Sequence, residues 1–314
     1  MKKLLSISLV ITSVLSFSSC SNQKKTSFQI TETYRVTSSN GSASILSVDL
    51  PVSYGYQTIG AIKVENTHSY SFEEKNGYRT LHAILMGSGK EEVVIIEYEV
   101  TLQRGNCTWR EENRGEYLAP EQFVDSDNQS IVELANTLKA NDDKFNTAKN
   151  VFRYTVKNVK YDSSDKINQK TLKASEVLKN KKGVCQDYAN LMTALLRSSG
   201  IPAKSISGLT LNRVRLKKSS NWSSPAVSHA WVEFCIDGEW YIADPTWGNR
   251  YFIYSDGYHL SYGSQIANLN SHNRETSNNE GFITVGEMVA PIKFKVQSED
   301  AKARVIPRVD IIKQ

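Results

Sequence analysis

Alternating apolar and polar positions dominate the first third of the chain and predict β-strands there. Between Val94 and Leu102 every second residue is apolar, and most of the residues between them are polar. Such alternation is typical of a strand with one buried and one solvated face. Pairs of asparagine or serine with glycine, which favour tight turns, recur through residues 28–104. We therefore predict an N-terminal β-sandwich-like domain over residues 20–112.

In the middle of the chain this alternation gives way to apolar residues three and four positions apart, the spacing of a helix face. One apolar stripe covers residues 131–138 and a second covers 145–159. A further helix is predicted to begin at Cys185, because good helix formers follow until Gly200 and Pro202 end the pattern. These stripes predict a layer of packed helices.

Two strand-like segments flank Asp237-Gly238, a pair that strongly favours a hairpin turn. With a two-residue turn, Trp231 faces Asp244, and His229 lies two residues further along the same face. His229 and Asp244 are then diagonal neighbours, whereas a three-residue turn would put them on opposite faces. Pro245 ends the second strand, so the carboxylate is expected at the end of the sheet.

The last part of the chain again has the pattern of strands. We predict a β-rich C-terminal extension over residues 256–314, which either completes the sheet of the hairpin or packs on the N-terminal sandwich. His259 and His272 lie in or beside its loops without recognisable partners. His68 and His82 are likewise interpreted as structural, because neither has a partner nearby in the sequence.

Composition and charge describe an ordinary globular protein and give no sign of nucleic-acid binding. Of the 314 residues, 39% are hydrophobic and 23% are charged, with a formal net charge of +5. The basic residues are scattered, and their densest group is the loop 213–218. This loop and the aromatic residues Trp222, Trp231 and Trp247 are candidates for the lining of a substrate cleft.

The first 19 residues have the features of a secretory signal, with Lys2 and Lys3 before a short apolar run that ends at Phe17. Residues 17–20, Phe-Ser-Ser-Cys, resemble the lipobox of bacterial lipoproteins, although that motif usually has leucine in place of Phe17. The resemblance implies an exported protein anchored to a membrane of the cell envelope through lipid on Cys20. The alternatives are a plain cleaved signal or a buried N-terminal helix.

Three cysteines remain beyond Cys20, and only Cys185 is expected at a helix start. Backbone N–H groups and the positive end of a helix dipole converge at such a position, where they favour a thiolate. Cys235 is a weaker candidate nucleophile because it lies within a strand. Cys107 and Cys235 either form a disulfide or are core thiols, and we expect core thiols. The chain has no CxxC pair, so neither a zinc ribbon nor a thioredoxin-like site is indicated.

Cys185, His229 and Asp244 together supply a nucleophile, a base and a group that orients the base. Each has a structural interpretation when taken singly: a core thiol, a histidine at a strand end and a turn-forming aspartate. Taken jointly and in this order, they favour a catalytic site. A metal site of the same three residues lacks an evident fourth ligand, so we expect no metal and no cofactor.

Three segments of the chain resemble the transglutaminase-like superfamily of papain-like fold: residues 183–189 (Gly-Val-Cys-Gln-Asp-Tyr-Ala), 229–233 (His-Ala-Trp-Val-Glu) and 240–247 (Trp-Tyr-Ile-Ala-Asp-Pro-Thr-Trp). The resemblance covers roughly residues 115 to 250. It implies an α+β fold, in which a helix bearing Cys185 packs on an antiparallel sheet bearing His229 and Asp244. We place this catalytic domain at residues 113–255.

The resemblance also implies a reaction, in which the thiolate attacks a peptide or carboxamide carbonyl and forms a thioester. Hydrolysis of a protein or peptide substrate is preferred to cross-linking. Tyr161 and Gln186 are candidate donors to the oxyanion, beside the backbone N–H of Cys185; alternatively Tyr161 only packs and Gln186 faces solvent. The other interpretation of the whole chain is a catalytically silent binding or scaffolding lipoprotein. The oligomeric state is left open.

Overall fold

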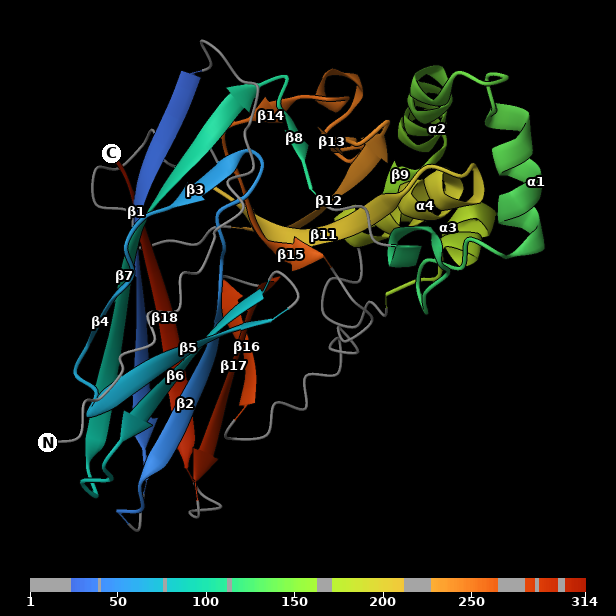
Figure 1. The fold of residues 1–314 in the computed structure, drawn as a ribbon. Helices are drawn as coiled ribbons and strands as arrows, with labels where there is room; N and C mark the ends of the chain where they lie inside the picture. Colours follow the sequence, from blue (N-terminus) through green and yellow to red (C-terminus); the bar gives the residue numbers. More distant parts are fainter. Residues whose placement is uncertain are drawn as a thin grey trace, which may run out of the picture.

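The computed structural model describes residues 24–38, 41–75, 78–111, 115–162, 171–211, 227–264, 280–285, 288–298 and 303–314. Within them the fold is α+β, as predicted, with two sheets on one side and helices on the other (Figure 1). The helices are α1 (Gln129–Leu138), α2 (Lys144–Asn158), α3 (Ala174–Asn180) and α4 (Cys185–Ser198), with 3-10 turns η1 (Gly115–Leu118) and η2 (Asn249–Tyr251). None of the helices in this part of the chain is long and apolar enough to cross a membrane.

Two of the sheets form a sandwich. The first consists of β14 (Ser255–Asp256), β7 (Glu91–Gly105), β1 (Lys24–Thr37) and β18 (Arg304–Lys313) in that order, with β3 (Gln57–Ile59) and β4 (Lys63–Glu65) also paired to β7. The second consists of β16 (Glu280–Val285), β17 (Met288–Ser298), β2 (Ser44–Leu50), β6 (Tyr78–Leu85) and β5 (Ser69–Lys75). Apolar residues of both sheets share one core. The predicted alternation holds in β7, where every second residue from Val94 to Leu102 is buried.

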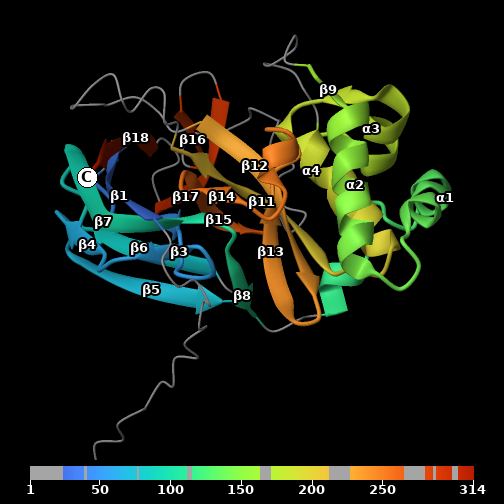
Figure 2. The ribbon, with the colours of Figure 1, turned by 90° about the horizontal axis from the view of Figure 1, so that it is seen from above.

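The third sheet lies next to the helices and consists of β15 (His259–Ser264), β11 (Ala203–Thr210), β12 (Val227–Ile236), β13 (Glu239–Ala243) and β8 (Thr108–Arg110). A short parallel pair, β9 (Lys160–Tyr161) and β10 (Lys182–Gly183), precedes α4. Helix α4 is buried along almost its whole length between this sheet and the other helices (Figure 2). Strands β8 and β15 both lie outside the range 113–255 expected for this unit.

The helices begin where the sequence supplies a capping side chain. Asn128 accepts a hydrogen bond from the backbone N–H of Ser130 at the start of α1, at 3.1 Å. Asp143 accepts one from the N–H of Asn146 at the start of α2, at 2.9 Å. Such caps satisfy N–H groups that have no acceptor within the helix. Asp143, which lies between the two predicted apolar stripes, therefore marks the start of α2.

The hairpin of β12 and β13 has the predicted register. Ile236 pairs with Glu239 and Val232 with Ala243, as a two-residue turn requires. Both turn residues, Asp237 and Gly238, have positive φ, at 51° and 84°. This geometry matches the twist of the strands and suits an Asp-Gly pair. The register confirms the expectation that residues 229 and 244 lie on one face of the sheet.

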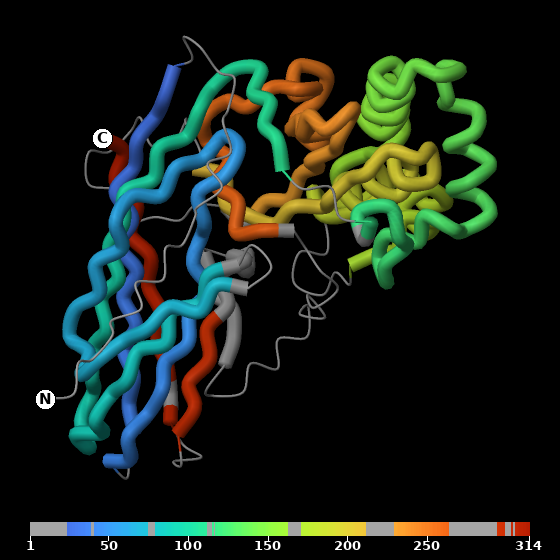
Figure 3. The backbone as a smooth tube through the Cα atoms, in the orientation of Figure 1, coloured from blue at the N-terminus to red at the C-terminus, as the bar shows by residue number. Residues whose placement is uncertain are grey.

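The C-terminal segment contributes strands to each of the three larger sheets. Strand β15 adds an edge to the third sheet, β14 and β18 join the first, and β16 and β17 join the second. Figure 3 shows its red strands beside the blue strands of the N-terminal region. The two packing alternatives left open for this segment therefore occur together.

Some of the sequence predictions fall outside the described residues: the signal at 1–19, Cys20, the basic loop 213–218, Trp222 and His272. His82 has hydrogen-bonding partners within the sandwich. Its Nδ1 lies 2.9 Å from the hydroxyl of Ser47 and its Nε2 3.4 Å from Glu73. These partners come from neighbouring strands, so they are distant in the sequence.

Candidate active site

Cys185 is the first residue of α4, and the turn before it depends on Asp187. The Asp187 carboxylate accepts the N–H of Val184 at 2.8 Å and the N–H of Leu172 at 3.1 Å. A Cβ on Gly183 would lie 2.5 Å from that side chain, so only glycine fits there. Burial raises the pKa of Asp187 to about 6, against the effect of these two hydrogen bonds. The residues around the cysteine therefore build the turn that presents its thiol at a helix N-terminus.

His229 and Asp244 meet across the hairpin as the register requires. The Nε2 of His229 lies 2.7 Å from Oδ2 of Asp244, and both side chains are almost fully buried. The other carboxylate oxygen of Asp244 accepts the N–H of Thr246 at 2.9 Å. These contacts fix the carboxylate, which in turn fixes the imidazole ring. The geometry places the two residues as the sequence analysis expected.

Cys185 is the other neighbour that raises the pKa of His229, through a side-chain hydrogen bond and through its charge. Because Nε2 faces Asp244, Nδ1 is the nitrogen left for the sulfur. Burial lowers the pKa of His229, but the charge and hydrogen bond of Asp244 and the contact with Cys185 outweigh it, so the pKa rises to about 10. The three residues thus form one buried series in which an imidazolium between a sulfur and a carboxylate is stabilised.

His259 is a fourth member of this cluster, and sequence reasoning missed it. It starts β15 and is fully buried, with Nε2 3.0 Å from Oδ2 of Asp244 and Nδ1 3.0 Å from Oδ1 of Asp256. Burial lowers the pKa of His259, but the charge of Asp256 and the hydrogen bonds to both carboxylates raise it overall. A ring with a carboxylate at each nitrogen donates at both, so His259 is an imidazolium.

Asp244 is consequently shared between two imidazole rings. Burial raises its pKa, but the charge of His229 and the hydrogen bonds from both histidines keep it well below the ordinary range. The carboxylate is therefore ionised. The one local signal for His259 was the spacing Asp256-x-x-His259, and no periodicity indicated that this segment pairs with β11.

Aromatic rings enclose His229 and His259. Trp247 stacks on His229, with ring centres 4.9 Å apart, and lies 4.6 Å from His259. Trp231 packs against His259 edge to face at 4.9 Å, and its indole N–H donates to the hydroxyl of Tyr56 at 3.0 Å. Trp231 is fully buried, which corrects its expected place in the lining of a cleft. Trp247, in contrast, is half-buried and lies over the site.

Tyr161 and Gln186 differ in what they can contribute. Strand β9 pairs Tyr161 with Gly183, two residues before Cys185, and half of the tyrosine side chain is exposed. Burial, followed by the charge of Cys185, raises the pKa of Tyr161 to about 12, so its hydroxyl keeps its proton. The Gln186 amide gives its two hydrogens to Asn190 and Ser205, at 2.7 and 3.2 Å. Its side chain is thus not an available donor, which corrects that expectation.

Cys107 and Cys235 form no disulfide within the described residues and are buried in a separate apolar cluster, as expected of core thiols. For Cys235, burial raises the pKa, which disfavours a thiolate. The side chains of His229, Asp244 and His259 could together offer ligand atoms to a metal ion, since these atoms lie within 4.8 Å of one another. Those atoms are already hydrogen-bonded to each other, so an ion would have to replace these bonds.

The middle of the chain matches a known protein family in sequence. Residues 132–245 match the sequence model of the transglutaminase-like superfamily, which confirms the resemblance seen in the three segments. A stretch of 126 residues is 34% identical to the UPF0252 protein MJ1282 of Methanocaldococcus jannaschii. That match covers 36% of this chain and 34% of the archaeal protein, so the chain spans about a third of that relative's length.

Comparison with solved structures found the following matches. A candidate cysteine protease from Cytophaga hutchinsonii superimposes with a TM-score of 0.52, over 96% of this chain and 100% of the other, at 16% identity. The periplasmic domain of TgpA from Pseudomonas aeruginosa gives a TM-score of 0.37 over 65% of this chain and 70% of the other, also at 16% identity. The first of these likenesses shows that the whole described fold, including the sandwich, has a counterpart.

Proposed function

We propose that this chain, whose residues 132–245 form a transglutaminase-like core, is a cysteine enzyme that acts on peptide or carboxamide bonds through a thioester. The observation that carries the proposal is the buried, hydrogen-bonded series of Cys185, His229 and Asp244. Thiol-based acyl transfer needs a nucleophile, a base and a group that orients the base. Cys107 and Cys235 lie in a different apolar cluster from Cys185.

In the first half of the reaction, the Cys185 thiolate attacks the carbonyl carbon and gives a tetrahedral oxyanion. The backbone N–H of Cys185 and the hydroxyl of Tyr161 are the proposed donors to that oxygen. The C–N bond then breaks, and His229 gives the proton on Nδ1 to the departing amine. The products of this step are a thioester on Cys185, the free amine and a neutral His229.

In the second half, water or another amine attacks the thioester. Neutral His229 takes the proton of the attacking group, the C–S bond breaks, and the thiolate and imidazolium form again. Asp244 holds the ring in one orientation throughout and stabilises each imidazolium. We propose hydrolysis of a protein or peptide substrate as the main reaction, with transfer to an amine as the variant of the same chemistry.

We propose that this enzyme is exported and anchored to a membrane of the cell envelope, in the periplasm or on the cell surface. The features that support it are the charged and apolar start of the chain and the sequence Phe17-Ser18-Ser19-Cys20. Mass spectrometry of the N-terminal peptide from membrane fractions tests it, with a lipid-modified Cys20 expected. A Cys20→Ala protein that stays in the membrane fraction would contradict lipid anchoring.

The experiment that tests the enzyme is alkylation of Cys185 by iodoacetamide as a function of pH, mapped by mass spectrometry. We expect reaction well below pH 8.5, roughly where an ordinary thiol ionises. His229→Ala and the closer replacement His229→Gln should both abolish the reaction at acid pH. Circular dichroism of each variant shows whether it is folded.

Cys107 and Cys235 serve as internal controls in the same digest, because both are buried thiols in a different apolar cluster from Cys185. They should react only when the protein is unfolded. If Cys185 behaved as they do, or if its reaction at acid pH survived both His229 replacements, the enzyme proposal would fail. The alternative, a binding or scaffolding protein that keeps the fold without turnover, would then be preferred.

A further inference from the structure

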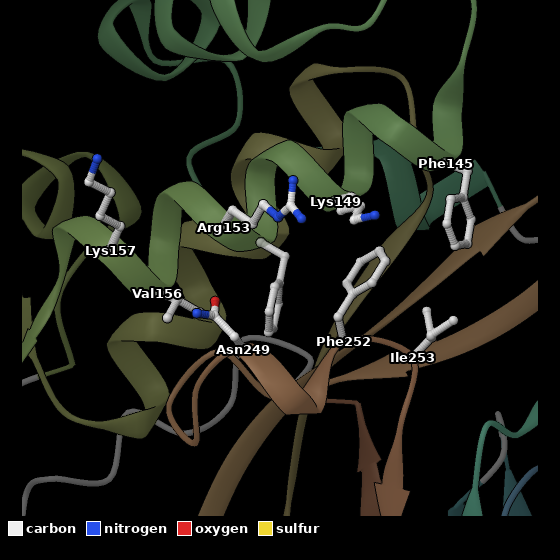
Figure 4. Close-up of a pocket in the computed structure, with 9 residues that line it drawn as sticks. Phe145, Lys149, Arg153, Val156, Lys157, Asn249, Phe252 and Ile253 are labelled. Carbon is white, nitrogen blue, oxygen red and sulfur yellow. The ribbon is translucent and has the colours of Figure 1, made fainter.

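A groove of about 730 Å³ lies between α2 and residues 249–253, which follow the hairpin. Figure 4 shows that Lys149, Arg153 and Lys157 follow one side of the groove along the helix, while Asn249 and Phe252 face them from the other side. The groove is therefore built from two segments that are about 100 residues apart in the sequence. None of its lining residues belongs to the series around Cys185.

The groove is positively charged without any compensating acid. The three cations of α2 are spaced by four residues, so they lie on the same face of the helix, about 6 Å apart along its axis. No aspartate or glutamate lines the groove. Within the described part of the chain, Lys149, Arg153 and Lys157 form no ion pair. Like charges at this spacing repel one another, and a bound anion would relieve the repulsion.

The floor of the groove is aromatic. The ring of Phe252 lies 5.6 Å from that of Phe145 and 5.2 Å from that of Phe152, measured between ring centres. Phe252 and Phe145 are partly exposed. A surface of aromatic rings beside a row of cations suits a ligand that has both apolar side chains and carboxylates. That combination describes an acidic peptide better than a sugar or a purely ionic ligand.

Residues 249–253, which line the groove opposite α2, are bonded directly to the segment that carries Asp244. The carbonyl of Tyr251 accepts the N–H of Asp244 at 2.9 Å, and Phe252 forms a β-bridge with Ala243. Trp247, which stacks on His229, also packs edge to face on Tyr251 at 5.2 Å. Residues 247–252 therefore contact the cluster on one side and a charged groove on the other.

We propose that this groove binds an acidic, partly apolar segment of the peptide substrate, at a distance from the carbonyl that Cys185 attacks. The inference rests on the proposed function and adds a substrate class to it. From Phe145 to Lys157 the helix extends about 18 Å, at 1.5 Å per residue. An extended peptide of about five or six residues has this length. Specificity would thus come from residues outside the bond that is cleaved.

The test measures binding without turnover, in the Cys185→Ala protein. The probe is a fluorescein-labelled peptide in which glutamates alternate with leucine and phenylalanine, and its counterpart has lysine in place of each glutamate. Fluorescence anisotropy should show binding of the acidic peptide alone, weakened by added salt. Replacement of Lys149, Arg153 and Lys157 by glutamine should lower the affinity by at least about tenfold, since three charge contacts are lost.

The matched control replaces Lys90, Lys139 and Lys179 by glutamine, which gives the same change in net charge at exposed positions outside the groove. This control should bind the acidic peptide as well as the parent does. Equal binding by the groove variant, equal weakening in the control, or absence of binding at low salt would overturn the proposal. So would a preference of the groove for anionic phospholipid vesicles over the peptide.

The two proposals fail separately. The groove variant in the background with Cys185 intact should keep the alkylation profile of the wild type, because its replacements do not touch the catalytic cluster. If the wild type shows no alkylation at acid pH while the groove still binds the acidic peptide, the proposal of a cysteine enzyme is wrong and the proposal of a peptide-binding groove is supported. If alkylation occurs at acid pH but the peptide does not bind, the enzyme proposal is supported and the groove proposal is wrong.

Discussion

His259 gives the carboxylate of Asp244 a second buried cation. The two rings bind the same oxygen, Oδ2, at 2.7 Å for His229 and 3.0 Å for His259, and their ring centres lie 5.5 Å apart. Asp244 and Asp256 thus alternate with the two imidazole rings in one buried series of hydrogen bonds. His259 therefore adds a positive charge to the buried surroundings of Cys185. It acts through Asp244 and does not contact Nδ1 of His229.

Replacing His259 by asparagine is expected to shift the alkylation profile of Cys185 to higher pH, by about half a unit to one unit. The reason is that a buried positive charge near the thiolate is lost, so the thiolate is less favoured. The measurement is the same iodoacetamide titration. A role in packing alone would lower stability and leave the pH profile where it was.

His82→Asn is the control for this experiment, since His82 hydrogen-bonds to Ser47 within the sandwich. It should leave the alkylation profile of Cys185 unchanged. A His259→Asn profile that overlays the wild type, in a protein that is still folded, would remove the electrostatic role of His259.

At the scale of single residues, local sequence predicted that Cys185 begins a helix and that His229 and Asp244 are neighbours. Cys185 lies at a predictable helix start, and His229 and Asp244 lie on a hairpin with a two-residue turn. His259 was not predictable in the same way. Its contact with Asp244 depends on the pairing of β15 with β11, about 50 residues earlier, and no periodicity encodes such a pairing.

At the scale of elements, the start of α4 depends on a single side chain, that of Asp187, which contacts the backbone at three residues. Asp187 holds the N–H groups of Val184 and Leu172, and it packs against Gly183, which pairs with Tyr161 in the short parallel sheet. The same few residues therefore set the position of the thiol and of the tyrosine proposed to bind the oxyanion. Gly183 and Asp187 are therefore needed for the turn before α4, whatever the chemistry of Cys185.

We expect Gly183→Ala to destabilise the protein by about 1 to 3 kcal/mol and to slow alkylation of Cys185 at acid pH. The new Cβ would lie 2.5 Å from Asp187, so the cap of α4 must move and the thiol moves with it. Urea unfolding and the alkylation rate measure the two effects. Gly115→Ala is the control, because a Cβ there meets nothing within 4 Å and the φ is not positive. Equal stability of the two variants would contradict this account of the turn.

At the scale of the whole molecule, strands from the two ends of the chain pair with each other. Strand β18 pairs with β1 and β17 with β2, across more than 240 residues of sequence. The apolar pattern predicted that strands exist at both ends, but alternation is the same whichever neighbour a strand takes. The sandwich and the third sheet also share one core, to which Leu209, Leu260 and Tyr262 contribute. The third sheet is thus supported by the sandwich.

A buried carboxyl group lies in this shared core. Glu32 of β1 is fully buried and accepts hydrogen bonds from the hydroxyls of Tyr34, at 2.6 Å, and Tyr98, at 2.5 Å. Tyr98 lies 3.0 Å from the hydroxyl of Tyr262 in β15, so the group connects the sandwich to the catalytic sheet. Burial raises the pKa of Glu32 to about 7, although both hydrogen bonds oppose the shift.

The stability of the whole protein should therefore depend on pH through Glu32. Between pH 4.5 and about 7 the folded state keeps a proton that the unfolded state has released, so this group makes the free energy of unfolding fall as the pH rises. The full effect above that window is about 3 kcal/mol, from roughly 2.5 pKa units. Glu32→Gln removes the ionisable group and keeps one carbonyl acceptor, with an NH2 donor in place of the second oxygen, which resembles the protonated carboxyl. In urea unfolding at pH 5 and pH 8, the wild type should lose more stability between the two than the variant does. Glu99→Gln, on the exposed face of β7, should behave as the wild type does, and an equal loss in Glu32→Gln would show that Glu32 is not the group that links pH to the fold.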